Sequence, residues 1–280
     1  MTKTDREESG DRLLDEDKQR TRDQWSQDPC GAESDRVHEF GTREYFDEVE
    51  RARYQEYAPW MPELMGFDQF AGARLLEVGC GMGSDLLQFA RGGAVCTAID
   101  LTPRSIAITR ERFALYGEKA NFMIADSERL PLSANSFDVV YSNGVLHHTP
   151  DTAGAIREVH RVLKPGGIAK VMLYYKHSFN YWGEMILHRG VLGGELFRGR
   201  SPEEIMSRWV EYSAHGATPL VKAYSRKQAL DLFRSFAEIK IDVEQLLRSE
   251  IPVVGRLIPG SLFNFLRRNV GWNLIITARK

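Results

Sequence analysis

Cysteine is scarce in this sequence, and its few cysteines lie far apart. Of 280 residues only three are cysteine, at Cys30, Cys80 and Cys96. Their spacing matches neither a zinc-binding pattern nor a disulfide framework, and we predict no metal site. A reducing, cytoplasmic setting is therefore expected.

Long apolar runs and an excess of one charge are also missing. No apolar run approaches the roughly 20 residues that cross a bilayer, so no membrane-spanning helix is expected. The first 25 residues lack the apolar segment of a secretory signal, so no such signal is expected. The formal net charge of −2 gives no global positive field, and nucleic acid is not an expected partner. The hydrophobic fraction of 42% nevertheless suffices for a full core.

What the sequence does contain is the stretch LLEVGCGMGSD at residues 75–85. Apolar residues and one carboxylate, Glu77, precede three glycines at alternate positions, and the helix-like segment LLQFARGG follows. The pattern predicts a buried strand, a tight loop that a ligand can approach closely, and a helix N-terminus with unpaired N–H groups. Such a loop holds the polar end of a nucleotide-like ligand.

Two different segments precede this stretch. Residues 1 to about 24 are charge-rich, and a disordered or loosely helical tail is expected there. In residues 42–60, apolar and aromatic side chains recur at helical spacing, which predicts one amphipathic helix ending before Pro62. These side chains are Tyr45, Phe46, Val49, Tyr54 and Tyr57. We assign residues 25–72 to an N-terminal helical lid, with plain packing on the core as the alternative for the aromatic stripe.

From residue 73 to residue 280, strand-like and helix-like segments alternate. Strands are predicted at AVCTAIDL, near NFMIA, from Phe137 to Ser142, and at IAKVMLYY, AEIKIDVEQ and GWNLIITARK. Helices between them begin at Thr102 with Pro103 and at Asp151 or Thr152, and KPGG ends the second of these. The alternation predicts an α/β domain with a mostly parallel sheet and helices on both faces.

Residues 177–222 interrupt the alternation. They include a helix start at Ser201, with proline at the next position and Glu204 placed for a capping box. We interpret this segment as an insertion after the fifth strand that caps the substrate.

The glycine spacing separates two classes of ligand. The dinucleotide fingerprint is G-x-G-x-x-G, whereas here the third glycine comes one residue early and no basic residue lies in residues 75–83 to meet a phosphate. Further polar motifs follow the predicted strands in order. They are Asp100, Asp126 with Ser127, SNGVLHHTPD and RVLKPGG.

This ordered set resembles the class I S-adenosylmethionine-dependent methyltransferases, in particular the small-molecule branch that includes quinone and sterol methyltransferases. The resemblance covers roughly Leu75 to Tyr175. It implies a Rossmann-like sheet of seven strands whose last strand runs antiparallel between its neighbours. It also implies S-adenosyl-L-methionine as cofactor and in-line methyl transfer to an organic small molecule.

The resemblance assigns cofactor-binding roles to residues that follow the first four strands. Those implied to line the methionine part are Glu77, Gly79, Gly81, Gly83 and Asn143. Those implied to meet the ribose and adenine are Asp100, Leu101, Asp126 and Ser127. The residue types agree with these roles, because a carboxylate can accept from two vicinal hydroxyls and tolerates a nearby sulfonium cation.

A general base is needed only where the acceptor must lose a proton. Histidine suits that role, and His147 is our first candidate and His148 the second, because the loop after strand four borders the methyl group in this fold. A structural hydrogen bond is the alternative role for each. Further candidates from the loop after strand five and from the insertion are Tyr174, Tyr175, His177, Tyr212 and His215.

The class of acceptor stays open in the sequence. The main interpretation is a small molecule, and a protein or RNA acceptor is the alternative, although SNGV stands where an Asn-Pro-Pro-Tyr-type loop would mark amino-nitrogen methylases. A non-catalytic nucleotide-binding module, or a nicotinamide enzyme, is the remote alternative. Residues 251–270 combine leucine, isoleucine and phenylalanine with three arginines, a composition of packed helices or of a segment at a membrane surface. In the second case the chain contacts a membrane peripherally and the acceptor is lipid- or quinone-like.

Overall fold

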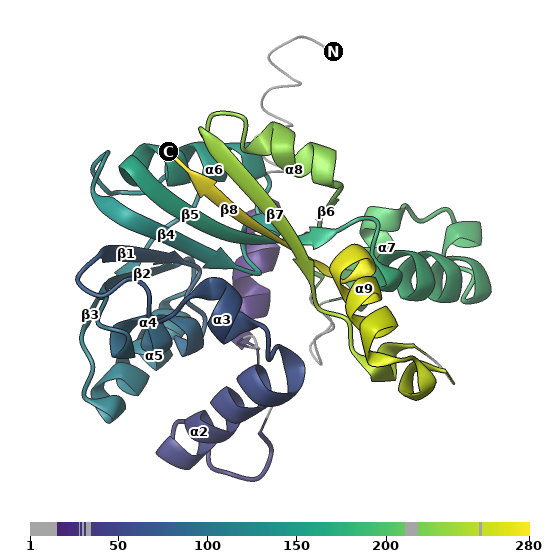
Figure 1. Cartoon of the computed structure of the whole chain (residues 1–280), viewed down its shortest axis with the longest axis horizontal. Helices are drawn as coiled ribbons and strands as arrows, with labels where there is room; N and C mark the ends of the chain where they lie inside the picture. The colour runs from purple at the N-terminus through teal and green to yellow at the C-terminus, as the bar shows by residue number, and fades with distance from the viewer. Residues whose placement is uncertain (1–15, 28, 30, 32–34, 211–217, 252–253) are drawn as a thin grey trace.

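A mixed sheet of eight strands organises the computed structural model of the chain (Figure 1), which describes residues 16–27, 29, 31, 35–210, 218–251 and 254–280. The strands are β1 (Arg74–Val78), β2 (Val95–Asp100), β3 (Ala120–Ile124), β4 (Phe137–Asn143), β5 (Leu163–Tyr175), β6 (Ala223–Tyr224), β7 (Glu238–Glu244) and β8 (Asn273–Arg279). Seven of them follow the order β3-β2-β1-β4-β5-β8-β7, and β8 runs antiparallel to both neighbours. The predicted Rossmann-like sheet is confirmed, and β6, which pairs with β5 outside this path, is an addition that was not predicted.

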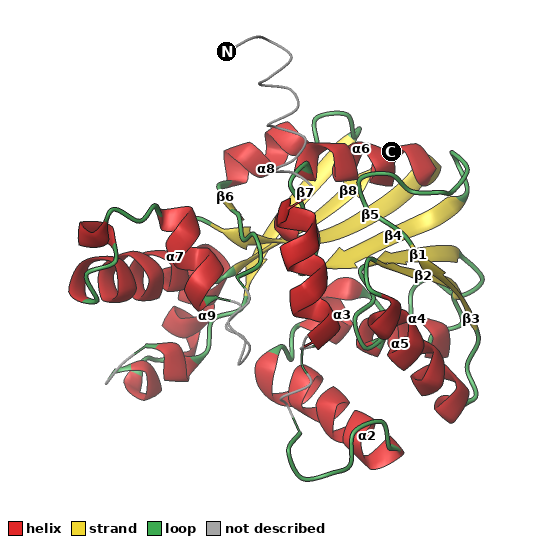
Figure 2. Cartoon of the chain, turned by 180° about the vertical axis from the view of Figure 1, so that it is seen from behind, coloured by secondary structure: helices red, strands yellow, loops and turns green. Residues whose placement is uncertain are grey.

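Helices cover both faces of the sheet (Figure 2). The α-helices with defined bounds are α2 (Arg43–Arg51), α3 (Met61–Met65), α4 (Ser84–Arg91), α5 (Pro103–Tyr116), α6 (Thr152–Val162), α7 (Pro202–Trp209), α8 (Arg226–Leu232) and α9 (Gly260–Val270). The 3-10 or π-helical segments are η2 (Ala52–Tyr57), η3 (Leu146–His148), η4 (Asn180–Leu192), η5 (Leu196–Arg198), η6 (Arg248–Glu250) and η7 (Gly255–Leu257). Residues 16–27 are also helical.

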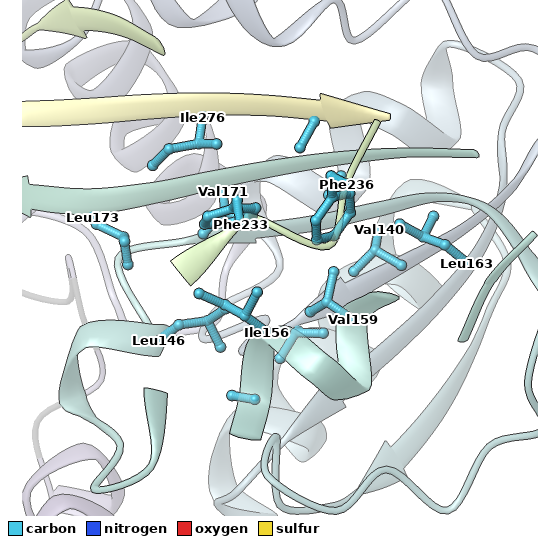
Figure 3. Packing of buried hydrophobic residues seen from close by; sticks show 14 of the residues in the cluster. Val140, Leu146, Ile156, Val159, Leu163, Val171, Leu173, Phe233, Phe236 and Ile276 are labelled. Atoms are coloured by element: carbon cyan, nitrogen blue, oxygen red, sulfur yellow. The ribbon is translucent and has the colours of Figure 1, made fainter. Parts of the chain in front are cut away.

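The core divides into two layers because successive strand residues point to opposite faces. One layer joins α6 and α8 to the sheet, and Figure 3 shows its side chains, among them Ile156 and Val159 of α6, packed against strand residues. The other layer joins α3, α4 and α5 to the opposite face through the intervening strand residues. Leu76 belongs to the first layer and Leu75 to the second.

The predicted helix starts are confirmed by their hydrogen bonds. The Thr102 hydroxyl accepts from the backbone N–H of Ser105 at the start of α5, and the Asp151 carboxylate accepts from that of Gly154 at the start of α6. Ser201 and Glu204 form the complete capping box of α7. These caps satisfy N–H groups that the helices themselves leave unpaired.

The N-terminal region differs from the predicted pattern. The helix expected over residues 42–60 extends from Arg43 to Tyr57 and ends before Pro62, as predicted, but its second half, η2, is π-helical. Pro62 lies in a separate short helix, α3, that was not predicted. Within the expected tail, residues 16–24 belong to a helix in which Thr21 and Gln24 are buried. The remaining tail residues, 1–15, lie outside the described residues, as do Cys30, Tyr212 and His215.

The boundary between α6 and β5 also differs slightly. The helix ends at Val162, and KPGG belongs to the extended β5, which has an irregular register with β4 between Phe137 and Val139. Gly166 has a φ of 78°, which favours glycine at this point.

The described residues between 177 and 210, with 218–222, form a small unit of short helices beside the sheet. Side chains of η4 and α7 pack with Val221 and with Trp272, which precedes β8, in a separate apolar cluster. The far end of the unit supports the loop after β4, since Lys222 donates its backbone N–H to the carbonyl of His147 and its ammonium to the carbonyls of Thr149 and Pro150.

A buried arginine ties the N-terminal region to the glycine loop. Arg112 of α5 is fully buried and donates to the Ser84 hydroxyl at 2.7 Å and, at longer range, to the Phe46 carbonyl and the Glu50 carboxylate. Its guanidinium also lies 4.8 Å from the centre of the Phe46 ring. One side chain therefore links α2, α4 and α5.

We expect Arg112→Met to lower the free energy of unfolding by about 2–3 kcal/mol, because hydrogen bonds from a buried charged donor are lost. Arg91→Met is the matched control, since Arg91 pairs with the same Glu50 at 2.8 Å but is partly exposed, and it should cost less than about 1 kcal/mol. Denaturant unfolding measures both variants. Equal losses would contradict the role given to Arg112.

Candidate active site

A cavity of about 230 Å³ lies where β1, β2, β3 and β4 reach their carboxyl ends. Eight of the predicted cofactor residues line it, namely Glu77, Gly79, Gly81, Asp100, Leu101, Asp126, Ser127 and Asn143. Residues separated by up to 66 positions thus meet at one edge of the sheet (Glu77 and Asn143), as expected for parallel strands.

The three loop glycines have different roles. Gly79 and Gly83 have positive φ angles, and a Cβ there would lie 2.3 Å from Val145 and 2.5 Å from Thr109, so packing excludes side chains. Gly81 also has a positive φ, but a Cβ there would meet nothing within 4 Å. Open space at a cavity-lining glycine is what close approach of a ligand requires.

Asp100 links the glycine loop to the start of α5. Its Oδ2 accepts from the Gly81 N–H at 3.1 Å, and its Oδ1 accepts from the backbone N–H and the hydroxyl of Thr102 at 2.9 and 3.0 Å. A carboxylate offers about four acceptor positions, so Oδ2 keeps room for a ligand hydroxyl. Burial raises the pKa of Asp100, and these hydrogen bonds oppose that shift.

A buried ion pair forms part of the cavity wall. Arg53 of η2 makes a bidentate contact with the Asp85 carboxylate at 2.8 and 2.7 Å, and the hydroxyls of Tyr54 and Tyr141 donate to the same carboxylate at 2.6 and 2.7 Å. Burial acts to raise the pKa of Asp85, but Arg53 and the two hydroxyls outweigh it and hold this pKa below its ordinary value.

Glu77 lacks such a partner for one of its oxygens. The side chain is 3% exposed, and its Oε2 has no hydrogen-bond partner among the described residues. Burial, together with the carboxylates of Asp85 and Asp100, raises the pKa of Glu77 well above its ordinary value. A cationic group bound beside Glu77 would stabilise the ionised carboxylate.

The N-terminal helix reaches the opposite end of the cavity. Lys18 lies 2.8 Å from Asp126 and 2.5 Å from Glu128. Glu128 also accepts from the Asp151 N–H at 2.7 Å, so residues 16–27 are tied to the loops after both β3 and β4. The charge-rich sequence around Lys18 gave no signal of this contact.

The rest of the cavity wall is mostly aromatic or apolar. It is formed by side chains from the N-terminal region, from the loop after β4, from β5 and from the start of β8. Among them are Trp25, Tyr57, Trp60, Met61, His148, Met172, Tyr174 and Asn273. Of these, only His148 and Tyr174 were named as candidate catalytic residues, because strand-end motifs point to a cofactor and carry no information on which distant residues complete the wall.

His148 is the better-placed of the two predicted histidines. It lines the cavity, and its Nδ1 lies 2.7 Å from the Leu220 carbonyl. A carbonyl can only accept, so the neutral ring carries its proton on Nδ1 and its lone pair on Nε2. The Trp25 ring stands edge-on to the His148 ring at 5.6 Å.

Two predicted site residues are corrected. His147, the first candidate for the base, is fully buried outside the cavity lining, with its ring 3.9 Å from that of Tyr174. Gly83, the N-cap residue of α4, is also outside the cavity lining. It lies against the side chain of Thr109 of α5, where a Cβ on Gly83 would clash. Tyr175 and His177, and the other described residues of 177–222, do not line the cavity, so the described part of the insertion lies beside the site.

Within the described ranges, no cluster of His, Cys, Asp and Glu residues could hold a metal ion. None of the helices in that part of the chain is long and apolar enough to cross a membrane.

Comparisons with known proteins agree with this geometry. Residues 76–171, from β1 into β5, match the methyltransferase-domain family. The chain therefore contains a class I S-adenosylmethionine-dependent methyltransferase domain, as the sequence motifs predicted, and S-adenosyl-L-methionine is its cofactor.

Two curated relatives align with the same part of the chain. A ubiquinone biosynthesis O-methyltransferase of Xanthomonas axonopodis pv. citri is 41% identical over 98 residues, which cover 35% of this chain and 41% of the relative. A sterol 4-C-methyltransferase of Caenorhabditis elegans is 35% identical over 94 residues, 33% of this chain and 28% of the relative. The matched part thus spans less than half the length of either relative.

A solved structure extends the similarity of fold to most of the chain. A methyltransferase from Thermotoga maritima, described as a possible histamine N-methyltransferase, has a TM-score of 0.52 and 21% identity, and the match covers 85% of this chain and 93% of that one. At this identity the likeness concerns the fold alone.

The cavity residues fit this cofactor. The buried atoms Glu77 Oε2, Asn143 Oδ1 and Asn273 Oδ1 have no hydrogen-bond partner within the described part of the chain, although they belong to residues that line the cavity. Buried polar atoms are almost always hydrogen-bonded. A ligand with an ammonium group and hydroxyls can supply the missing donors, and the open space at Gly81 admits it.

We expect buried His147 to make the free energy of unfolding depend on pH. Burial and the neighbouring His148 hold the pKa of His147 well below its ordinary value of 6.5. Below pH 6.5, His147 is protonated in the unfolded chain but stays neutral in the folded chain. The free energy of unfolding therefore falls by up to about 1.4 kcal/mol per pH unit, until the pH reaches the pKa of His147 in the folded protein.

Urea unfolding at pH 7.5 and pH 5.5 measures this slope. His147→Gln should reduce the loss between the two pH values by about 1 kcal/mol, whereas His177→Gln, at an exposed position, should leave it unchanged. An unchanged slope in His147→Gln would refute the assignment.

Proposed function

We propose that this protein transfers the methyl group of S-adenosyl-L-methionine to an organic small molecule. The observation that carries the proposal is the continuity of one cavity, in which eight predicted cofactor residues and a mostly apolar wall containing His148 share the same space. Cover by residues 16–27 and by the 53–61 segment favours a small acceptor over a macromolecule. The names of the two relatives, a sterol methyltransferase and a ubiquinone biosynthesis methyltransferase, support an apolar organic acceptor.

The bound cofactor supplies a methyl carbon activated by a sulfonium leaving group. The protein's contribution is then mainly orientation and exclusion of water. Glu77 and Asp100 hold the polar groups of the donor, and Arg53 keeps Asp85 ionised beside them. Trp25, Trp60 and Tyr174 form the apolar wall against which an acceptor packs.

His148 acts as general base where the acceptor loses a proton. With Nδ1 donating to Leu220, the Nε2 lone pair is the position that takes the proton. This role favours acceptors whose methylated atom carries a proton, such as a phenolic hydroxyl or an amine.

We also propose a cytoplasmic location with peripheral membrane contact through residues 251–270. The cysteine usage, the basic and apolar composition of that segment, and the apolar wall of the cavity support it. A lipid- or quinone-like acceptor would be consistent with such a location.

Incubation with isotopically labelled S-adenosyl-L-methionine and a total lipid and metabolite extract, followed by mass analysis, tests the function. The proposal expects a small organic product carrying the label only when the protein is present. Label found solely on protein or RNA would contradict it.

Asp100→Asn should weaken the binding of S-adenosyl-L-methionine by about 10- to 100-fold, because an amide replaces one charged acceptor of a ligand hydroxyl. Asp231→Asn, at an exposed position of α8, is the control and should bind normally. Calorimetric titration gives both affinities, and full affinity in Asp100→Asn would remove that residue from the cofactor site.

His148→Gln should lower kcat by at least about 100-fold, the usual range for loss of a general base, with cofactor affinity retained. His147→Gln should keep kcat within a few fold at a temperature where it is folded, because His147 does not line the cavity. The reverse ranking of the two variants would restore His147 as the base.

A further inference from the structure

Exposed apolar side chains are concentrated in two segments of the chain. Seventeen large apolar side chains are exposed among the described residues, and ten of them lie within residues 182–209 and 254–265. The most exposed in the first segment are Leu192 (74%) and Phe197 (81%), and in the second Leu257 (80%) and Phe265 (62%). We call these four side chains, with Trp182, Leu187, Val254 and Leu262, the apolar surface.

The exposure in the second segment is fixed by contacts. The Arg248 guanidinium donates to the carbonyls of Gly255 and Ile258 at 3.0 and 2.7 Å and lies 4.4 Å from the centre of the Phe263 ring. A Cβ at Gly255 would lie 2.0 Å from the Arg248 carbonyl, so the turn packs too tightly for a side chain. The turn holds Leu257 outward while α9, which has no buried residue, exposes Leu262 and Phe265.

The charges around the apolar surface are predominantly positive. Residues 251–270 contain three arginines and no acidic residue, and Arg256 and Arg268 are exposed. The first segment contains four arginines and four glutamates, and Glu203 and Glu204 are exposed at the start of α7. Its other two glutamates are paired locally. Glu184 pairs with Arg189 at 2.7 Å and with His188, and Glu195 pairs with Arg198 and Arg200.

The two segments lie side by side. Figures 1 and 2 show α9 and the unit that contains α7 at the end of the sheet away from β3. Trp272, two residues beyond α9, packs in the same apolar cluster as Tyr181 and Met185 of η4. Gln245 connects this region to the cavity wall. Its backbone carbonyl accepts from the backbone N–H of Trp272 at 2.6 Å, and its side-chain oxygen accepts from the indole N–H of Trp60 at 3.0 Å.

We propose that the apolar surface docks on the face of an anionic lipid membrane, with its apolar side chains inserted at the headgroup level and with Arg256 and Arg268 against the lipid phosphates. This extends the membrane contact proposed above to a second segment and to a lipid charge. It does not depend on methyl transfer. Apolar side chains flanked by arginines are the composition of interfacial segments.

A second copy of the chain fits the apolar surface less well. In a twofold dimer the same patch faces itself, and residues 251–270 carry three arginines and no acid that could pair with the same segment of a second copy. Like charges brought together at an interface oppose association. Anionic lipid supplies the complementary charge.

Co-sedimentation of the full chain with vesicles tests the docking. Binding is expected with phosphatidylglycerol and phosphatidylcholine mixed, and much less with phosphatidylcholine alone. Leu257→Asp with Phe265→Asp, and separately Leu192→Asp with Phe197→Asp, should each weaken binding at least tenfold. Val37→Asp, at a comparably exposed position of 87% outside the apolar surface, is the matched control and should bind normally.

Removal of the two positive charges and a measurement of molar mass complete the test. Arg256→Gln with Arg268→Gln should weaken binding more than tenfold, at about fivefold for each arginine near an anionic surface. The proposal is overturned if wild-type protein does not bind the anionic vesicles, if either apolar double variant binds normally, or if light scattering shows a dimer that the same variants dissociate. Methyl transfer to a water-soluble acceptor in vesicle-free solution reports separately on the proposed function.

Discussion

Three carboxylates are buried together at the carboxyl ends of β1 and β2, and this concentration of negative charge governs the site. Among Glu77, Asp85 and Asp100, only Asp85 pairs with a cation of the described residues, the Arg53 guanidinium. Asp100 is held by neutral donors, and one oxygen of Glu77 has no partner in the described residues. Burying acids without counter-ions costs stability. The three buried carboxylates are therefore matched to a cationic ligand. A ligand with a sulfonium and an ammonium group supplies the positive charge that the protein does not.

The same constraint explains why the N-terminal region belongs to the site. Arg53 reaches Asp85 from η2, and Lys18 reaches Asp126 from residues 16–27, so each end of the polar half of the cavity is closed by a cation from before β1. Arg112 links α2 to the residue after the glycine loop, because it donates to the Phe46 carbonyl and to the Ser84 hydroxyl. The sheet alone would leave the acids open to water, and the N-terminal contacts convert an edge of a sheet into a cavity.

Sequence reasoning located the sheet and most of the donor half, because strand ends and glycines at fixed spacing are local signals. The mostly parallel sheet and the antiparallel last strand agree with the structure, and eight of the nine predicted cofactor residues line the cavity. Gly83 and His147 were misplaced because neighbours in the sequence face different ways. His147 turns into the core against Tyr174, while His148 faces the cavity. Lys18, Arg53 and Asn273 were missed because only tertiary packing brings them to the site.

The direct test of the account is a calorimetric titration of the full chain with S-adenosyl-L-methionine and, under the same conditions, with NAD. Because the cavity presents buried carboxylates and the glycine loop carries no base for a phosphate, we predict saturable binding of S-adenosyl-L-methionine at one site and no binding of NAD. Binding of NAD without binding of S-adenosyl-L-methionine would contradict the central claim that the site is built for a cationic donor.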